Sequence, residues 1–351
     1  MEIQRILFTT NAAEALSEAL RLTDHDRLFV LTDAVTAQLC WPLVSETCRE
    51  EQLVTIPAGD DHKTTDSLIH VWQSLSSGGA SRRSLMVNIG GGMVTDLGGF
   101  AASTFKRGIR FINIPTTLLS MVDASVGGKT GINLGGLKNE VGTFRNAEEV
   151  IIDTHFLRTL DADNLRSGYA EMLKHALISR REDWAELLRF DILRPDFGVL
   201  QTLVEKSVEV KRRVVTEDPE EHGIRKSLNL GHTVGHAFES LSLRTGHPVL
   251  HGYAVAWGLV CELYLSCKRT AFPHDVMLQT AAFIKETYGT YSFDCKRYEE
   301  LYELMTHDKK NANGIINFSL LSDIGQVCLN QAATKEEIFD MLDFYRETMG
   351  A

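Results

Sequence analysis

The sequence has few cysteines, no strongly apolar run of membrane length and no basic tail. Its six cysteines include no CxxC pair and are scattered over the chain, so we expect reduced thiols and a cytoplasmic protein. The first residues lack a basic segment followed by an apolar run, so we expect no signal peptide. The most apolar helical stretch, 253–267, contains Glu262 and is too short to span a bilayer. These absences predict a soluble protein with no membrane partner.

The charge balance also excludes a class of partner. Lys and Arg number 36 against 47 Asp and Glu, which gives a net charge of −11 over 351 residues. Such a chain is poorly suited to gripping nucleic-acid phosphates, so we expect no nucleic-acid partner. Any anionic ligand must instead be held by a local cluster of Lys and Arg.

The pattern of apolar residues divides the chain into two parts. Short β-rich runs at 27–33, 53–56, 84–89, 110–114 and 150–152 alternate with helical segments at 11–21 and 64–75. This alternation predicts an α/β domain with a parallel sheet over residues 1–159. Helical patterns at 165–179, 197–215, 229–242, 253–268, 274–288 and 335–349 predict a mainly α-helical domain over 160–351, with a small hairpin at 315–321 and 326–329.

Two glycine segments resemble phosphate-binding motifs without matching them. Gly90-Gly91-Gly92 joins a strand to a helix, where backbone N–H groups can approach a phosphate. The usual dinucleotide fingerprint is incomplete, because Thr95 stands where its third glycine belongs. The segment 126–130 ends in GKT, but a P-loop would need glycine at Asp123. We therefore expect a glycine-rich loop that presents Lys129 to an anion.

A set of histidines in the second part indicates a metal. His232 and His236 lie at i and i+4, on one face of a helix. His251 begins the next apolar helix, and Glu171 offers a carboxylate; two histidines and a carboxylate with an open position suit catalytic zinc. An HxxxH pair is also common as a structural pair in a core. The spacing alone leaves three further histidines open as ligands, and these are His175, His222 and His247.

Seven segments, in order, resemble the family of 3-dehydroquinate synthases. They are GGGMVTDLGGFAASTFKRG, INIPTTLLSMVDASVGGKTGIN, LKNEVGTF, GYAEMLKHAL, VKRRVVTEDPEEHGIRKSLNLGHTVGHAFE, LHGYAV and HDKKNANG. The resemblance implies an NAD-binding α/β domain followed by a helical metal- and substrate-binding domain. It implies conversion of 3-deoxy-D-arabino-heptulosonate 7-phosphate, a small phosphorylated sugar acid, to 3-dehydroquinate and phosphate in the shikimate pathway. It also implies NAD, Zn²⁺ (or Co²⁺ in its place) and a homodimer.

The resemblance assigns roles residue by residue. The metal ligands would be Glu171, His232 and His251, and catalytic roles would fall on Lys129, Lys174, Glu221, Arg225, Asn229 and His236. The NAD contacts would be Asp33, Asp60, Lys63, Gly91, Gly92, Asp96, Thr116, Thr117, Lys138, Phe156 and Thr159. The substrate contacts would be Arg107, Asp123, Lys129, Asn139, Lys174, Lys211, Arg225, Asn229 and one of Lys309 and Lys310.

The reaction that the family carries out explains this inventory. A substrate hydroxyl is oxidised by NAD, phosphate leaves by β-elimination, the ketone is reduced again, and the ring closes by an aldol step. Lys and Arg side chains would hold the carboxylate and phosphate, while His236 and Glu221 would transfer protons. Three positions depart from the usual family pattern: Tyr253, the pair Arg145-Asn146, and Ser167.

Three alternatives stay open from the sequence. Another sugar-phosphate cyclase, making a valiolone or an inosose, would share the fold, NAD, metal and elimination chemistry. A metal-dependent polyol dehydrogenase of the glycerol dehydrogenase type would accumulate NADH, but the additional basic residues argue against it. A non-catalytic homologue would not be expected to retain Glu171, His232, His251 and Lys129 together.

Overall fold

A computed structural model describes residues 4–48, 51–135, 137–306 and 316–351. The described chain forms two compact units. The first unit contains the described residues up to Asp161 together with Asp196–Val208. The second contains Ala162–Pro195 and the described residues from Glu209 onward, so the division falls inside helix α7 (Phe197–Glu217).

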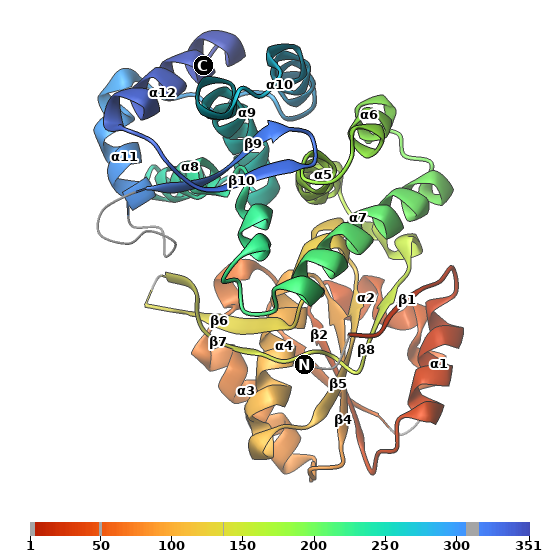
Figure 1. Cartoon of the computed structure of the whole chain (residues 1–351). Coiled ribbons are helices and arrows are strands. Elements are labelled where there is room, and N and C mark those ends of the chain that lie inside the picture. The colour runs from red at the N-terminus through yellow and green to blue at the C-terminus, as the bar shows by residue number, and fades with distance from the viewer. Residues whose placement is uncertain (1–3, 49–50, 136, 307–315) are drawn as a thin grey trace. The chain divides into compact units, whose positions relative to one another are not determined.

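The first unit is built on a six-stranded parallel sheet with the strand order β1-β8-β5-β4-β2-β3. The strands β2, β4 and β8 are buried at every residue, because helices cover the sheet and its Val, Ile and Leu side chains face them. The expected α/β fold with a parallel sheet is therefore confirmed (Figure 1). The strands are β1 (Ile6–Phe8), β2 (Leu28–Asp33), β3 (Gln52–Ile56), β4 (Leu85–Gly90), β5 (Arg110–Pro115) and β8 (Glu149–Ile152).

The helices of the first unit place glycines and polar residues at the carboxyl ends of the strands. Helix α4 begins at Gly92, directly after β4, and packs on β4 and β5. Helix α1 begins behind Asn11, whose side chain accepts a hydrogen bond from the backbone N–H of Glu14. The helices are α1 (Ala12–Leu22), α2 (Thr36–Leu39), α3 (Thr65–Ser77) and α4 (Gly92–Thr104).

The glycine-rich loop expected around Lys129 ends at Gly128, and a hairpin begins directly after it. Strands β6 (Lys129–Leu134) and β7 (Leu137–Phe144) pair antiparallel, and Lys129 lies exposed at the start of β6. Gly131 and Gly142 stand opposite each other, and a side chain on Gly142 would collide with the Thr130 carbonyl oxygen. Gly127 and Gly128, which suggested the loop, have positive φ angles in the turn before β6, while Gly131 and Gly142 allow the two strands to approach closely.

The second unit is mainly helical, as expected, with one late hairpin. Helix α9 is buried over most of its length and packs against α5, α8, α10, α12 and β9 (Figure 1). None of the helices in the described part of the chain has both the length and the apolar character that crossing a bilayer requires. The elements are α5 (Ala162–Leu177), α6 (Arg181–Arg189), α8 (His232–Arg244), α9 (His251–Thr270), α10 (His274–Tyr288), α11 (Tyr298–Thr306), α12 (Lys335–Met349), β9 (Asn317–Asp323) and β10 (Gln326–Ala332).

Two of the neighbours of helix α9 contact it through backbone atoms: α5 and the chain just before α8. A side chain on Gly258 would collide with the carbonyl oxygen of Gly231, just before α8, and one on Gly252 would collide with the Ser167 carbonyl oxygen of α5. Backbone atoms cannot rotate away as a side chain can. The distances between these three helices are therefore fixed by the two glycines.

We predict that Gly258→Ala destabilises the protein by roughly 1–3 kcal/mol, as overpacking in a dense core does. The added methyl group would push α9 away from the Gly231 backbone. Gly198→Ala in α7 is the matched control, because its new methyl group would meet only the Asp196 side chain at 3.3 Å. Urea unfolding should show a lower free energy of unfolding for Gly258→Ala and not for Gly198→Ala. Equal stability of the two variants would contradict the packing argument.

Candidate metal centre and nucleotide site

Three side chains from three helices of the second unit converge on one point. Glu171 lies in the middle of α5, while His232 and His251 are the first residues of α8 and α9. The Nε2 atoms of His232 and His251 lie 3.3 and 3.6 Å from the same oxygen, Oε1 of Glu171. The three ligand atoms lie within 4.8 Å of one another, which is a spacing that a single cation can bridge.

The chemistry of these residues fits a divalent metal. Glu171 is fully buried, and its Oε1 accepts no hydrogen bond of normal geometry from any described residue. His232 directs Nδ1 at the Leu230 carbonyl oxygen, 3.1 Å away, so that a proton on Nδ1 leaves Nε2 free to bind a metal. Two imidazoles and one carboxylate, with room for another ligand, form a typical catalytic zinc set.

The electrostatics of the group favour one neutral and one protonated histidine in the metal-free protein. Burial lowers the pKa of His232 to about 3, despite the opposing effect of Glu171. Burial would also lower the pKa of His251, but the carboxylates of Glu171 and Glu239 beside its ring outweigh it and raise the pKa to about 10. The two shifts differ because His251 faces two carboxylates, whereas His232 faces one and lies near Lys174. The two carboxylates thus favour the protonated form of His251, and a metal ion would compete with that proton.

Lys174 is part of this centre. It lies one turn after Glu171 on α5, is buried, and forms an ion pair with Oε2 of Glu171. Burial would raise the pKa of Glu171, but Lys174 and His232 hold it well below its usual range. Lys174, which the family resemblance gives as a substrate contact, thus also keeps the metal-binding carboxylate of Glu171 ionised.

His236 and Glu239 form a second layer beside the three ligands. The His236 ring lies 5.3 Å from the His232 ring and 5.9 Å from the His251 ring, measured between centroids. Glu239 Oε2 lies 3.4 Å from Nδ1 of His251, which is the carboxylate–histidine arrangement that orients metal ligands. The sequence reasoning missed Glu239, although its position three residues after His236 places both on one helix face.

The three histidines left open by the spacing are placed differently. His222 is exposed and pairs with Glu220, and His247 is exposed in the loop after α8. His175 is buried on α5, four residues after Glu171. The described residues thus bring His232 and His251, and neither His222 nor His247, to Glu171.

The predicted anion-binding residues of the second unit lie on α7 and the segment after it. Lys211 and Arg225 are both buried, with 6% and 2% of their surface exposed. Arg225 donates through Nη1 to the Pro219 carbonyl oxygen at 2.6 Å. Asn229 donates through Nδ2 to Oε1 of Glu221 at 2.9 Å, which joins two of the residues predicted to be catalytic.

The predicted nucleotide contacts of the first unit follow the carboxyl ends of neighbouring strands. Asp33 ends β2, Gly91 and Gly92 follow β4, and Thr116 and Thr117 follow β5. Asp33 accepts two backbone N–H bonds of 2.8 Å, from Val35 and Thr36, which fixes its side chain. Ligands of open parallel sheets bind at this edge.

Side chains also connect these strand ends to the hairpin. Lys63, only 3% exposed, pairs with Asp96 of α4 and donates to Oδ1 of Asn139 in β7. Lys138 of β7 pairs with Asp60 at 3.2 Å. The structure therefore brings Asn139, predicted to contact the substrate, into contact with Lys63, predicted to contact the nucleotide.

The remaining predicted residues are more dispersed. Phe156 is buried and Thr159 donates to its carbonyl oxygen at 2.8 Å, while Arg107 is exposed after α4. Asp123 lies in a short helical turn, 120–124, before the hairpin. Lys309 and Lys310 lie outside the described residues.

The departures from the family pattern have structural partners. Arg145 donates its backbone N–H to the Gly128 carbonyl oxygen at 2.7 Å, so the Arg145-Asn146 pair packs on the glycine turn before β6. The Tyr253 hydroxyl accepts from Arg166 Nε at 2.8 Å and donates to Asp163 at 2.9 Å, which links α9 to α5.

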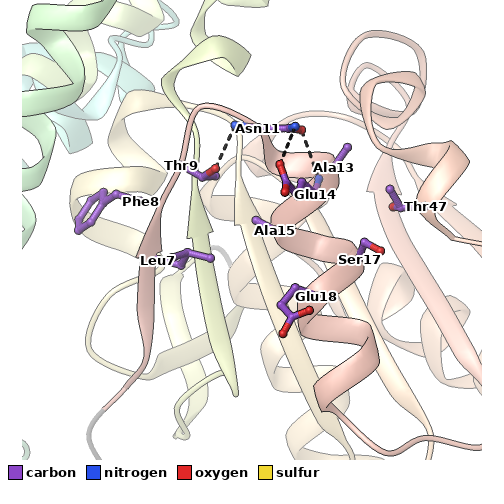
Figure 2. Close-up of a pocket in the computed structure, with 10 residues that line it drawn as sticks. All are labelled: Leu7, Phe8, Thr9, Asn11, Ala13, Glu14, Ala15, Ser17, Glu18 and Thr47. Carbon is purple, nitrogen blue, oxygen red and sulfur yellow. Dashed lines mark hydrogen bonds between the residues drawn. The ribbon is translucent and has the colours of Figure 1, made fainter.

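The first unit also has a surface hollow of about 610 Å³. Figure 2 shows its lining by β1, α1 and the segment after α2, with Asn11 bonded to Thr9 and Glu14. Its charged lining residues are Glu14 and Glu18. None of the predicted site residues lines it, so the hollow is not the site of the chemistry.

Comparison with known proteins gives a consistent result over the full chain. Residues 53–167 match the family model of the 3-dehydroquinate synthase N-terminal region, and residues 168–311 match that of the C-terminal region. The chain is 54% identical over 352 aligned residues to a 3-dehydroquinate synthase of Parabacteroides distasonis, with 100% of both chains covered.

Two solved structures have the same fold. One is a 2-epi-5-epi-valiolone synthase of Streptomyces hygroscopicus with NAD⁺ and Zn²⁺ bound; its TM-score is 0.86 at 25% identity, covering 99% of this chain and 98% of that one. The other is a 2-deoxy-scyllo-inosose synthase complexed with carbaglucose-6-phosphate, NAD⁺ and Co²⁺; its TM-score is 0.85 at 21% identity, covering 97% and 96%.

We predict that His251→Ala loses most of its bound zinc, because it removes one of the three converging ligands. His247→Ala is the control and should keep its zinc, since His247 is exposed in a loop outside the ligand group. Zinc content after dialysis, measured by elemental analysis, distinguishes the two. Equal loss in both variants would mean that the ligand set is wrong.

Proposed function

Because the chain belongs to the 3-dehydroquinate synthase family, we propose that it converts 3-deoxy-D-arabino-heptulosonate 7-phosphate into 3-dehydroquinate and phosphate. The observation that carries this proposal is the 54% identity to a curated synthase over the entire length of both chains. The convergence of Glu171, His232 and His251 supports it, because the chemistry needs a metal site and these residues fit one.

The cofactors of this reaction are NAD and a divalent metal, which we expect to be zinc. When bound, NAD supplies a temporary hydride acceptor and the metal supplies a Lewis acid. Glu171, His232 and His251 would hold the metal. The strand ends of the first unit, with Gly91 and Gly92 at the start of α4, would hold the NAD phosphates, because unpaired backbone N–H groups at a helix start attract anions.

The basic residues of the chain would bind and orient the substrate. Lys174, Lys211 and Arg225 are buried cations in a protein of net charge −11, so their burial serves a local purpose. Lysine and arginine bind phosphates and carboxylates through charge-assisted hydrogen bonds, and the proposed substrate carries both groups. We assign the same function to Lys129, Arg107 and Asn139 in the first unit.

Two residues are suited to proton transfer. His236 lies beside both histidine ligands without being one of the three, and an imidazole can exchange protons near neutral pH. Glu221 is held by the amide of Asn229, which fixes the direction of its carboxylate. We propose these two side chains as the acid–base groups.

The identity of the substrate distinguishes this proposal from the other sugar-phosphate cyclases. The chain is 25% identical to the valiolone synthase and 21% identical to the inosose synthase, against 54% for the dehydroquinate synthase. Arg225, which we expect to bind the substrate carboxylate, is consistent with a sugar acid. A guanidinium binds a carboxylate or a phosphate through two parallel hydrogen bonds, so Arg225 is suited to either anionic group of the sugar acid phosphate.

We further propose a cytoplasmic homodimer. All six cysteines of the described chain are free, as expected in a reducing compartment. The net charge of −11 argues against nucleic acid as a partner. Analytical ultracentrifugation of the purified protein measures the oligomeric state directly, and a single species at the mass of one chain would contradict the dimer.

We predict that the protein with NAD and zinc releases phosphate from the heptulosonate phosphate without accumulating NADH, because the NAD is regenerated in each cycle. A heptulose 7-phosphate without the carboxylate and glucose 6-phosphate serve as comparison substrates. Phosphate release from one of these in preference to the acid would favour another cyclase. Stoichiometric NADH, followed at 340 nm, would favour a dehydrogenase.

We predict that Arg225→Lys raises the KM for the heptulosonate phosphate by about 10-fold or more, because an ammonium cannot make the two parallel bonds of a guanidinium. Arg212→Lys in α7 is the matched control, since Arg212 is a half-buried residue paired with Glu209. Steady-state kinetics of both variants test the assignment. An unchanged KM in Arg225→Lys would show that Arg225 does not bind the substrate.

A further inference from the structure

The two histidine ligands have an unusual position in their helices. His232 is the first residue of α8 and His251 is the first residue of α9. Neither helix has a side-chain cap of its own, because Gly231 and Leu250 occupy the capping positions. The first turn of a helix has backbone N–H groups without partners inside the helix, and helix ends fray without a cap. A ligand at this position depends on whatever else holds the helix start.

In α8 the cap comes from another helix. Glu262, in the middle of α9 and fully buried, accepts a hydrogen bond from the backbone N–H of Gly231 through Oε2 at 2.7 Å. Its other oxygen, Oε1, accepts one from the backbone N–H of Val234 at 3.1 Å. These are the two donors that a capping box satisfies with two side chains of the same helix. Here one carboxylate of α9 satisfies both and encloses His232 between its two bonds.

In α9 the cap comes from α5. The Ser167 hydroxyl oxygen accepts a hydrogen bond from the backbone N–H of Gly252 at 3.0 Å, and both residues are buried. Gly252 follows His251 directly, and Ser167 lies one turn before Glu171 on α5. A hydrogen bond therefore ties the backbone next to one ligand to the helix that carries another.

We propose that Glu262 and Ser167 are positioning residues for the metal ligands, capping the helix starts at His232 and His251 from neighbouring helices. The ligand helices form a series in which α5 caps α9 and α9 caps α8. Each imidazole is thereby held in the direction of Glu171 before the metal arrives. Groups hydrogen-bonded to a ligating side chain typically change metal affinity by about 10- to 100-fold when they are removed. Glu262 and Ser167 act on the ligands through the helix backbone instead.

The inference rests on the metal site in the proposed function, but it makes a separate claim. A residue that only stabilises α8 would change the unfolding temperature and leave the metal affinity of the folded protein unchanged. A positioning residue changes the affinity itself. Zinc affinity and the absorption spectrum of bound Co²⁺ report on the ligand geometry without any turnover.

The test uses Glu262→Gln in the full-length protein. The amide keeps the size of the side chain, but its NH₂ group would face a backbone N–H group, so that one of the two hydrogen bonds is lost. We expect the zinc Kd, measured by competition with a chelator, to rise by about 10-fold or more, with a changed visible spectrum of the Co²⁺ form. Ser167→Ala is the second variant, and it keeps the inference testable if Glu262→Gln fails to fold. We expect it to raise the zinc Kd as well.

The matched control is Thr334→Ala. Thr334 forms the capping box of α12 with Glu337, in the same unit but on a helix without any of the ligands. Its loss should lower the unfolding temperature and leave the zinc Kd and the Co²⁺ spectrum unchanged. If Glu262→Gln and Ser167→Ala behave like this control, the inference is overturned. If in addition His251→Ala keeps its zinc, the metal site itself is wrong.

Discussion

The candidate metal centre depends on one constraint, which is the contact between three helix backbones in the second unit. Gly252 lets α9 touch α5, and Gly258 lets it touch the chain just before α8. Helices packed through ordinary side chains lie about 8–10 Å apart. Here the closer approach brings residues at the very start of α8 and α9 to a carboxylate in the middle of α5.

The same three helices bury several charged groups, namely Glu171, Lys174, Glu239 and Glu262. Burying a charge is costly unless it is paired or hydrogen-bonded, and a buried pair often contributes little net stability. Each of these groups has a defined partner: Lys174 pairs with Glu171, Glu239 contacts His251, and Glu262 binds two backbone N–H groups of α8. The apolar side chains of α9 offset the cost, since most of that helix is buried. These buried charged groups therefore favour the one arrangement of the helices in which each of them has its partner.

Much of the fold followed from the sequence, because buried strands leave a simple pattern. The apolar runs gave five of the six parallel strands, whereas β1 has only three residues and is too short for a period to be seen. The hairpin β6–β7 was not foreseen: the loop expected over 126–130 covers only 126–128, and Lys129 and Thr130 already belong to β6. Short helices α6 and α11 also escaped the pattern.

The site could be predicted only in part, for a different reason. The spacing of His232 and His236 indicated a metal, but only His232 belongs to the group with Glu171 and His251. The other two ligands come from other helices, which spacing cannot reveal. The resemblance to a family selected His251 over its neighbours, and the geometry brings it to Glu171. In the sequence, Glu262 indicated only that the apolar stretch 253–267 contains a charged residue and does not span a membrane. Its two bonds to α8 depend on how α8 packs against α9, which no local pattern encodes.

The division of the chain at Asp161 separates the two cofactor sets completely. Every residue proposed to hold the metal lies in the second unit, and every residue proposed to hold NAD lies in the first. Neither ligand set is left incomplete when the other cofactor is missing. The proposed ligand sets therefore share no residue, and they build no obligatory order of cofactor loading into the chain.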